Sequence, residues 1–176
     1  MTSLSRLLDS GKLEFLEMCS EHVMPTPEFY DALRSSRLHV LQLAFAGRVL
    51  FDNLVPVLDA LIGHSTLNCL DLSHFRFRTT TTLFALVHID YGCNDINLAN
   101  LLPIGAALGR LVGANSALTA LDVSECKLGD AGLSPLVDAL PGNTRLQRLS
   151  CGHNGVTPAL EARLAAIRCT INTLLK

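Results

Sequence analysis

The segment from Leu118 to Leu140 constrains the fold more than any other part of the sequence. Its first half places apolar residues, and one cysteine, at a fixed set of offsets: Leu118, Leu121, Val123, Cys126 and Leu128. The alternation around Leu121 and Val123 predicts a short strand with one buried face, and the leucines that follow are spaced as in a helix. A strand–turn–helix unit this small cannot bury its own apolar face. It must therefore stack on further units of the same kind.

The same pattern begins at six places along the chain of 176 residues. The starting residues are Leu13, Leu38, Leu67, Leu86, Leu118 and Leu146. The last three starts match the pattern best, whereas those at Leu38 and Leu67 lack the Asn or Cys. We therefore expect about six stacked repeats.

The spacing L-x-x-L-x-L-x-x-[N/C]-x-L, carried by Leu118–Leu128, resembles the leucine-rich repeats (LRRs) of the ribonuclease-inhibitor type. The resemblance covers roughly residues 13–156. It implies an α/β solenoid with a curved parallel sheet on the concave side and helices on the convex side. It also implies that the chain binds other proteins through its concave strands. Since the matching residues are structural, the resemblance indicates the fold and does not select one function.

Residues 1–176 are expected to form a single LRR domain. Residues 1–12 would be a partial N-terminal helix, 13–156 the repeats, and 157–176 a C-terminal capping helix. Within the repeats, helices are predicted after Thr26-Pro27, after Asn53, over 101–112 and over 133–140, from N-capping residues and helical apolar spacing.

Composition excludes several classes of function. The net charge of −2 gives no general attraction to nucleic acid or to an anionic membrane surface. No uninterrupted apolar run approaches the ~20 residues of a membrane-spanning helix, and the first residues do not have the pattern of a signal peptide. The six cysteines include no C-x-x-C pair. They are interpreted as small buried side chains in a reducing compartment, so we expect a cytoplasmic protein without metal or cofactor.

One row of concave side chains is expected to be acidic. The position between the second and third apolar residues of each repeat is occupied by Glu17, Gln42, Asp71, Asp90, Asp122 and Ser150. Strands ~4.8 Å apart would bring the three aspartates into one row. Their mutual repulsion would be relieved by a basic protein partner. The alternative is that each aspartate is solvated and hydrogen-bonds locally.

The neighbouring concave row is predicted to contain Phe15, Val40, Cys69, His88, Ala120 and Arg148. Cys69 beside His88 could supply a thiol nucleophile and a base, or the pair could join Asp71 or Asp90 as metal ligands. No third orienting group and no metal-ligand spacing accompany them. We therefore expect no enzymatic activity, and we assign His88 and Arg148 to the partner surface instead.

The predicted helix over 101–112 contains Gly105, Gly109 and Gly113 at intervals that permit close helix packing. The helix is apolar on nearly all sides, so its outer face is expected to pack against its neighbours or to be covered by another protein. The N-terminal end lacks a polar cap. We therefore expect self-association or incorporation into a hetero-complex.

Taken together, these patterns predict a protein–protein interaction module, or a scaffold subunit of a larger cytoplasmic assembly. The contact would lie on the concave face, on the apolar convex helix or at the ends. Alternatives from the resemblance are a regulator of a small GTPase, like the Ran GTPase-activating protein, and a structural component of the cilium or cytoskeleton. The GTPase alternative requires a catalytic residue set that the sequence does not show.

Overall fold

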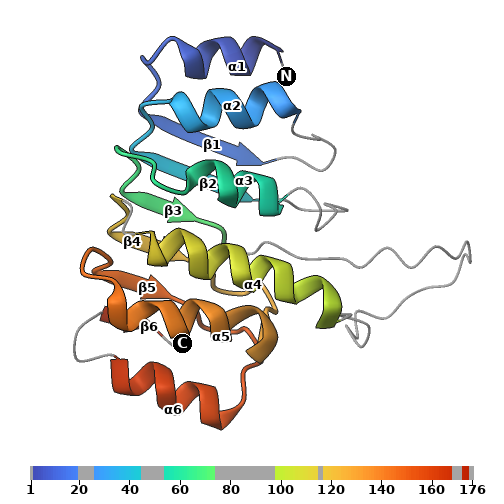
Figure 1. Ribbon diagram of the computed structural model, residues 1–176, viewed down its shortest axis with the longest axis vertical. Helices are drawn as coiled ribbons and strands as arrows, with labels where there is room; N and C mark the ends of the chain where they lie inside the picture. The colour runs from blue at the N-terminus through green and yellow to red at the C-terminus, as the bar shows by residue number, and fades with distance from the viewer. Residues whose placement is uncertain are drawn as a thin grey trace, which may run out of the picture.

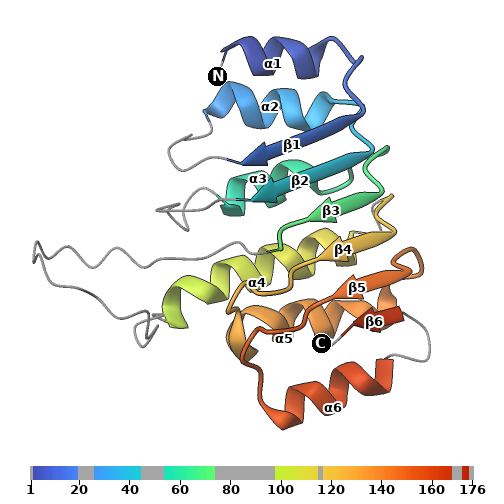
Figure 2. The same ribbon diagram turned by 180° about the vertical axis from the view of Figure 1, so that it is seen from behind.

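A parallel β-sheet with helices along one face forms the framework of the computed structural model, which describes residues 2–19, 26–44, 54–73, 98–114, 117–167 and 172–174. Six strands follow one another in chain order from β1 to β6, and each pairs in parallel with the next. Figures 1 and 2 show the helices on one side and the open strands on the other. The fold is therefore a mixed α/β arrangement with a parallel sheet.

The strands and helices alternate along the described chain. The strands are β1 (Phe15–Cys19), β2 (Val40–Ala44), β3 (Cys69–Asp71), β4 (Ala120–Asp122), β5 (Arg148–Ser150) and β6 (Asn172–Leu174). The helices are α1 (Thr2–Asp9), α2 (Pro27–Ser35), α3 (Leu54–Leu61), α4 (Leu98–Gly113), α5 (Gly129–Ala139) and α6 (Pro158–Ile167). A 3₁₀ turn, Leu140–Gly142, extends α5.

A row of leucines at the centre of the sheet fixes its register. Across β1 to β5, the paired positions are Leu16, Leu41, Leu70, Leu121 and Leu149. Each of these side chains is at most 9% exposed and points into the core between sheet and helices. The alignment predicted for the repeats that begin at residues 13, 38, 67, 118 and 146 is therefore confirmed.

The turns that follow the strands are held by the Asn/Cys position of the pattern. Asn154 is 3% exposed. Its Nδ2 donates to the Val123 and Cys151 carbonyls at 2.9 and 2.8 Å, and its Oδ1 accepts from Leu128 N at 3.1 Å. The equivalent Cys126 is buried, and its Sγ lies 2.9 Å from the Leu72 carbonyl oxygen. These bonds join turns of neighbouring units.

The predicted helices are present with shifted bounds. Helix α2 begins at Pro27 as expected, although the Thr26 side chain makes no capping hydrogen bond. Helix α4 is longer than the predicted 101–112, and α5 begins at Gly129 rather than Leu133. Gly63, with φ of 73°, follows α3 in the left-handed conformation that glycine adopts most easily.

The sequence predicted that the repeat at Leu86 adds a strand between those of the repeats at Leu67 and Leu118. This prediction was wrong. Strand β3 pairs directly with β4, with Leu70 opposite Leu121, so no strand from residues 86–91 lies between them. Residues 74–97 themselves lie outside the described part of the chain. A local match to the pattern supplies suitable side chains. Such a match does not determine whether the segment joins the sheet, or beside which strand.

The prediction of a capping helix over residues 157–176 was also wrong at its C-terminal end. Helix α6 ends at Ile167, and residues 172–174 add strand β6 beside β5. Apolar spacing alone suggested one long helix, but strand β6 contains Thr173, one of the β-branched residues. Such residues favour an extended backbone when a strand edge is available.

Among the described helices, none is long and apolar enough to cross a membrane. The longest of them, α4, has 16 residues and lies between α3 and α5. Its apolar residues Leu101, Ile104, Leu108, Leu111 and Val112 are buried. Most of its apolar side chains therefore pack within the core shared by the sheet and the helices, whereas Leu102 remains 54% exposed.

Candidate interaction surface on the open face of the sheet

The face of the sheet that carries no helices, seen in Figure 2, is here called the open face. It presents two rows of side chains. Residues on either side of each central leucine point to this face because side chains alternate along a strand. The first row is Phe15, Val40, Cys69, Ala120 and Arg148, and the second is Glu17, Gln42, Asp71, Asp122 and Ser150. Both rows are continuous in the sheet register.

Asp71 and Asp122 are the acidic centre of the second row, because they occupy paired positions on adjacent strands. One oxygen of each carboxylate accepts a bond from its own turn: Asp71 Oδ1 from Ser73 N at 2.8 Å, and Asp122 Oδ1 from Ser124 N at 2.9 Å. Asp71 Oδ2 also accepts from Gln42 Nε2 at 3.1 Å. The local hydrogen bonding considered as an alternative is therefore present, and it coexists with the acidic row.

The predicted neighbours Asp90 and His88 do not lie between these strands. Because β3 pairs directly with β4, Asp71 is next to Asp122, and Cys69 is next to Ala120 rather than His88. Asp90 and His88 lie outside the described residues. The interpretation that placed Cys69 beside His88 in the sheet register is therefore corrected, and with it the geometric basis for a thiol–imidazole pair or a shared metal site.

The environment of Cys69 also opposes thiolate chemistry. Burial raises the pKa of the Cys69 thiol, and the Asp71 and Asp122 carboxylates raise it further, whereas Arg148 opposes the shift. Burial raises the pKa of Cys151, with a smaller contribution from Asp122, to about 12. Since the thiolate is the nucleophilic form, both cysteines are poorly suited to covalent catalysis.

The ends of the rows have different chemistry from the centre. Glu17 and Phe15 are exposed on β1, where Phe15 retains 51% of its accessible surface. Arg148 is exposed on β5. It belongs to the same row as Phe15, four strands away. From β1 to β5, the open face thus presents an aromatic side chain and a carboxylate on β1, one carboxylate each on β3 and β4, and a guanidinium group on β5, next to β6.

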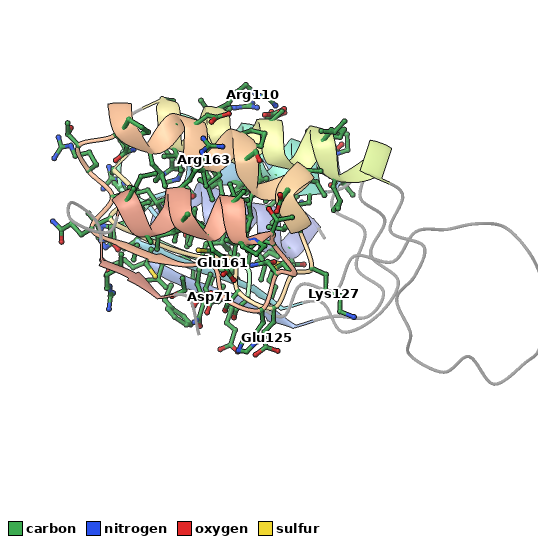
Figure 3. The ribbon with its side chains drawn as sticks, turned by 90° about the horizontal axis from the view of Figure 1, so that it is seen from below. Asp71, Arg110, Glu125, Lys127, Glu161 and Arg163 are labelled. Atoms are coloured by element: carbon green, nitrogen blue, oxygen red, sulfur yellow. The ribbon has the colours of Figure 1, made fainter. Side chains whose placement is uncertain are left out.

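Two carboxylates on the helical side are paired with arginines of a neighbouring helix, in contrast to Asp71 and Asp122 on the open face. Arg110 contacts Asp59 at 2.6 Å, and Arg163 contacts Asp138, in each case between neighbouring helices. Figure 3 shows Arg110 on the helical side and Asp71 on the strand side. Within the described residues, neither Asp71 nor Asp122 forms an ion pair. Two adjacent carboxylates without an ion-pair partner among the described residues therefore lie on the open face.

His64 is a buried polar residue that the sequence reasoning missed. Its side chain is 5% exposed. Its Nδ1 accepts from Leu67 N at 3.1 Å, while Nε2 lies 3.1 Å from Ser36 Oγ. Asn143 makes the equivalent bond to Leu146 N at 2.7 Å. The sequence does contain a signal for both residues, which is their shared position. His64 stands three residues before Leu67, and Asn143 stands three residues before Leu146, each the first leucine of a predicted repeat.

The chain was compared with models of known protein families and with curated protein sequences, and neither comparison found a match.

Proposed function

We propose that the chain is a leucine-rich repeat solenoid of the ribonuclease-inhibitor type. In this proposal it serves as a protein–protein interaction module or scaffold subunit of a larger cytoplasmic assembly. The chain-order parallel sheet, the single helical layer and the Asn154 and Cys126 turns support the repeat assignment. The partner binds on the open face, which is the concave side of such a solenoid.

The observation that carries this function is the pair of carboxylates Asp71 and Asp122. They stand on adjacent strands without an arginine or lysine partner in the described chain. Two like charges at this spacing repel by ~1 kcal/mol in a water-like dielectric. A basic group from another protein relieves this repulsion and is attracted from a distance by the field of the row.

The shape of the rows favours an extended basic segment as the bound element. From β1 to β5 the rows cross four strand spacings, or roughly 19 Å at ~4.8 Å per spacing. An extended peptide of about six residues covers this length at ~3.3 Å per residue. Lysine or arginine side chains at its centre would reach Asp71 and Asp122, and an apolar residue at one end would meet Phe15.

The test is affinity capture from cell extract with quantitative mass spectrometry, comparing three forms of the chain. The variant Asp71→Asn/Asp122→Asn removes both charges and keeps an oxygen that can accept from Ser73 N and Ser124 N. The control Asp31→Asn/Asp138→Asn removes two exposed aspartate charges from α2 and α5.

A specific partner should be retained by the wild type and by the helical control, and should be lost or at least severalfold reduced with the open-face variant. Its binding to the wild type should also weaken as salt rises, because exposed charges are screened within ~10 Å at 0.1 M ionic strength. Equal capture by all three forms would reject the open face as the binding site.

A further inference from the structure

An exposed cation stands beside the carboxylates of the open face. Arg148 belongs to the first row on β5, and Asp122 belongs to the second row on β4. Because Arg148 pairs with Ala120, Arg148 and Asp122 occupy diagonal positions on adjacent strands. Residues at such positions are roughly 7–8 Å apart. Among the residues that the structure describes, no carboxylate forms an ion pair with Arg148, so its guanidinium group is available to a partner.

The first row is lowest at its centre. Cys69 and Ala120 are paired on β3 and β4. Ala120 keeps 9% of its accessible surface, whereas Phe15 on β1 keeps 51%. The backbone of a bound segment can therefore approach the sheet most closely over Cys69 and Ala120, with the two carboxylates of the second row at its side and Arg148 on the next strand.

Charges of both signs act at this low point of the open face. Burial raises the pKa of the Cys69 thiol, the Asp71 and Asp122 carboxylates raise it further, and the Arg148 guanidinium group lowers it. A segment that carries only positive charge is attracted by the carboxylates and repelled by Arg148. Both effects become favourable when the segment carries an acidic side chain beside its basic ones.

We propose that the segment bound on the open face is bipolar, with basic side chains over Asp71 and Asp122 and an acidic side chain over Arg148. This inference rests on the proposed function, because it specifies the partner of the same face. In an extended segment, alternate side chains point to the same side and lie ~6.6 Å apart. That distance is close to the diagonal separation of Asp122 and Arg148. The acidic residue therefore stands two positions from the nearer basic residue, on the side of β5.

Arg148 then determines which basic segments bind. An acidic side chain gains a charge-assisted hydrogen bond from the guanidinium group. A uniformly basic segment would instead place a lysine or arginine against Arg148, and like charges that face each other reject a wrong partner. The carboxylate pair thus provides attraction, and Arg148 provides selectivity for the order of charges.

The test uses two synthetic peptides with blocked ends, so that no terminal charge contributes. The first, Leu-Ser-Lys-Ser-Lys-Ser-Glu, presents leucine, both lysines and glutamate on one side when it is extended, and the second has glutamine in place of glutamate. Fluorescence anisotropy of the labelled peptides measures their binding to the wild type, Arg148→Gln and Arg148→Lys. Arg145→Gln is the matched control, because it removes the same charge from an exposed residue in the segment before β5.

The wild type should bind the glutamate peptide about two- to fivefold more tightly than the glutamine peptide, as expected for an exposed ion pair. This preference should disappear in Arg148→Gln and persist in Arg148→Lys and Arg145→Gln. The glutamine peptide should bind Arg148→Gln more tightly than the wild type, because the repulsion of its lysines by Arg148 is removed. Circular dichroism checks that each variant keeps the fold.

Two results would overturn the bipolar segment: equal binding of both peptides by the wild type, or a preference for glutamate that survives in Arg148→Gln. The proposed function still holds in either case if Asp71→Asn/Asp122→Asn weakens binding of the glutamine peptide. If that variant binds the glutamine peptide as tightly as the wild type does, or if neither peptide binds the wild type, both proposals are rejected.

Discussion

At the scale of single residues, two glycines determine how closely α4 and α5 pack. A Cβ atom at Gly105 would lie 2.7 Å from the Gly132 carbonyl oxygen, and one at Gly109 would lie 2.8 Å from the Pro135 carbonyl oxygen. Both distances are shorter than van der Waals contact, and both involve backbone atoms that cannot rotate away. The predicted role of these glycines in close packing against a neighbouring helix is therefore confirmed for Gly105 and Gly109, but not for Gly113.

Replacing Gly105 by alanine should destabilise the protein by about 1–3 kcal/mol, because the added methyl group forces α4 and α5 apart. Chemical denaturation followed by circular dichroism measures the change in the free energy of unfolding. Gly113→Ala is the matched control in the same helix, since its Cβ would meet only Ala139 Cβ, at 3.9 Å. The control should be neutral or slightly stabilising, because alanine has the higher helix propensity. Equal effects at both positions would contradict the close-packing account.

At the scale of elements, His64 joins the turn after α3 to the turn after α2. Its Nδ1 must be unprotonated to accept from Leu67 N, so the neutral ring carries its proton on Nε2, facing Ser36 Oγ. Ser36 Oγ in turn donates to the Leu33 carbonyl at 2.9 Å. Burial lowers the pKa of His64, and a backbone hydrogen bond to Leu33 partly opposes the shift. No charged side chain in the described region contributes to it.

This lowered pKa predicts a loss of stability in weak acid. The unfolded chain takes up a proton near the ordinary histidine pKa of 6.5, whereas the folded chain resists protonation until lower pH. The contribution of His64 is therefore fully present above pH 6.5 and decreases as the pH falls from 6.5 towards the folded pKa. Denaturant unfolding measured at a series of pH values between about 7.5 and 5 tests this expectation.

The control for the acid effect is His64→Asn. Asparagine is the residue found at the equivalent position of a later repeat, Asn143. Asn143 Oδ1 accepts from Leu146 N without a titratable proton, so the variant should fold at neutral pH and lose less stability than the wild type on acidification. If the two proteins show the same pH dependence, His64 is not the group responsible.

At the scale of the whole molecule, the described strands form one row in which each pairs with its immediate neighbours. The central leucines of β4 and β5, Leu121 and Leu149, occupy paired positions and are 2% and 0% exposed. Leu41 on β2 is also fully buried, but β3 and β4 separate it from Leu149. Packing energy should therefore couple near neighbours and not distant units.

Each single substitution Leu41→Ala, Leu121→Ala or Leu149→Ala should cost about 2–5 kcal/mol, because it leaves a cavity in the core. The costs of Leu41→Ala and Leu149→Ala should add to within ~0.5 kcal/mol, whereas those of Leu121→Ala and Leu149→Ala should deviate from additivity by more. Urea titrations of the single and double variants provide the comparison. Strong coupling between Leu41 and Leu149 would contradict a core of locally interacting units.

Much of this arrangement could be predicted because the pattern is local. The spacing Leu118-x-x-Leu121-x-Val123 determines which side chains of β4 are buried, and its copies at Leu38, Leu67 and Leu146 extend the same register to three other strands. The adjacency of Asp71 and Gln42 on the open face follows from that register, whereas the sequence placed Asp90 rather than Asp122 on the other side of Asp71. That the described residues provide no ion-pair partner for Asp71 and Asp122 does not follow from it, since this depends on where the arginines of α2, α4 and α6 lie.

The sequence by itself determined the alternation of strand and helix, the buried leucine row and the acidic character of the open face. These properties depend on the 2-residue and 3.6-residue periods of side chains within one segment. Only the tertiary structure decided that β3 pairs with β4, that residues 172–174 form a strand, and that Gly105 contacts α5. Backbone hydrogen bonds between strands carry no side-chain signature, so a segment with suitable residues becomes a strand of the sheet only where a neighbouring edge accepts it.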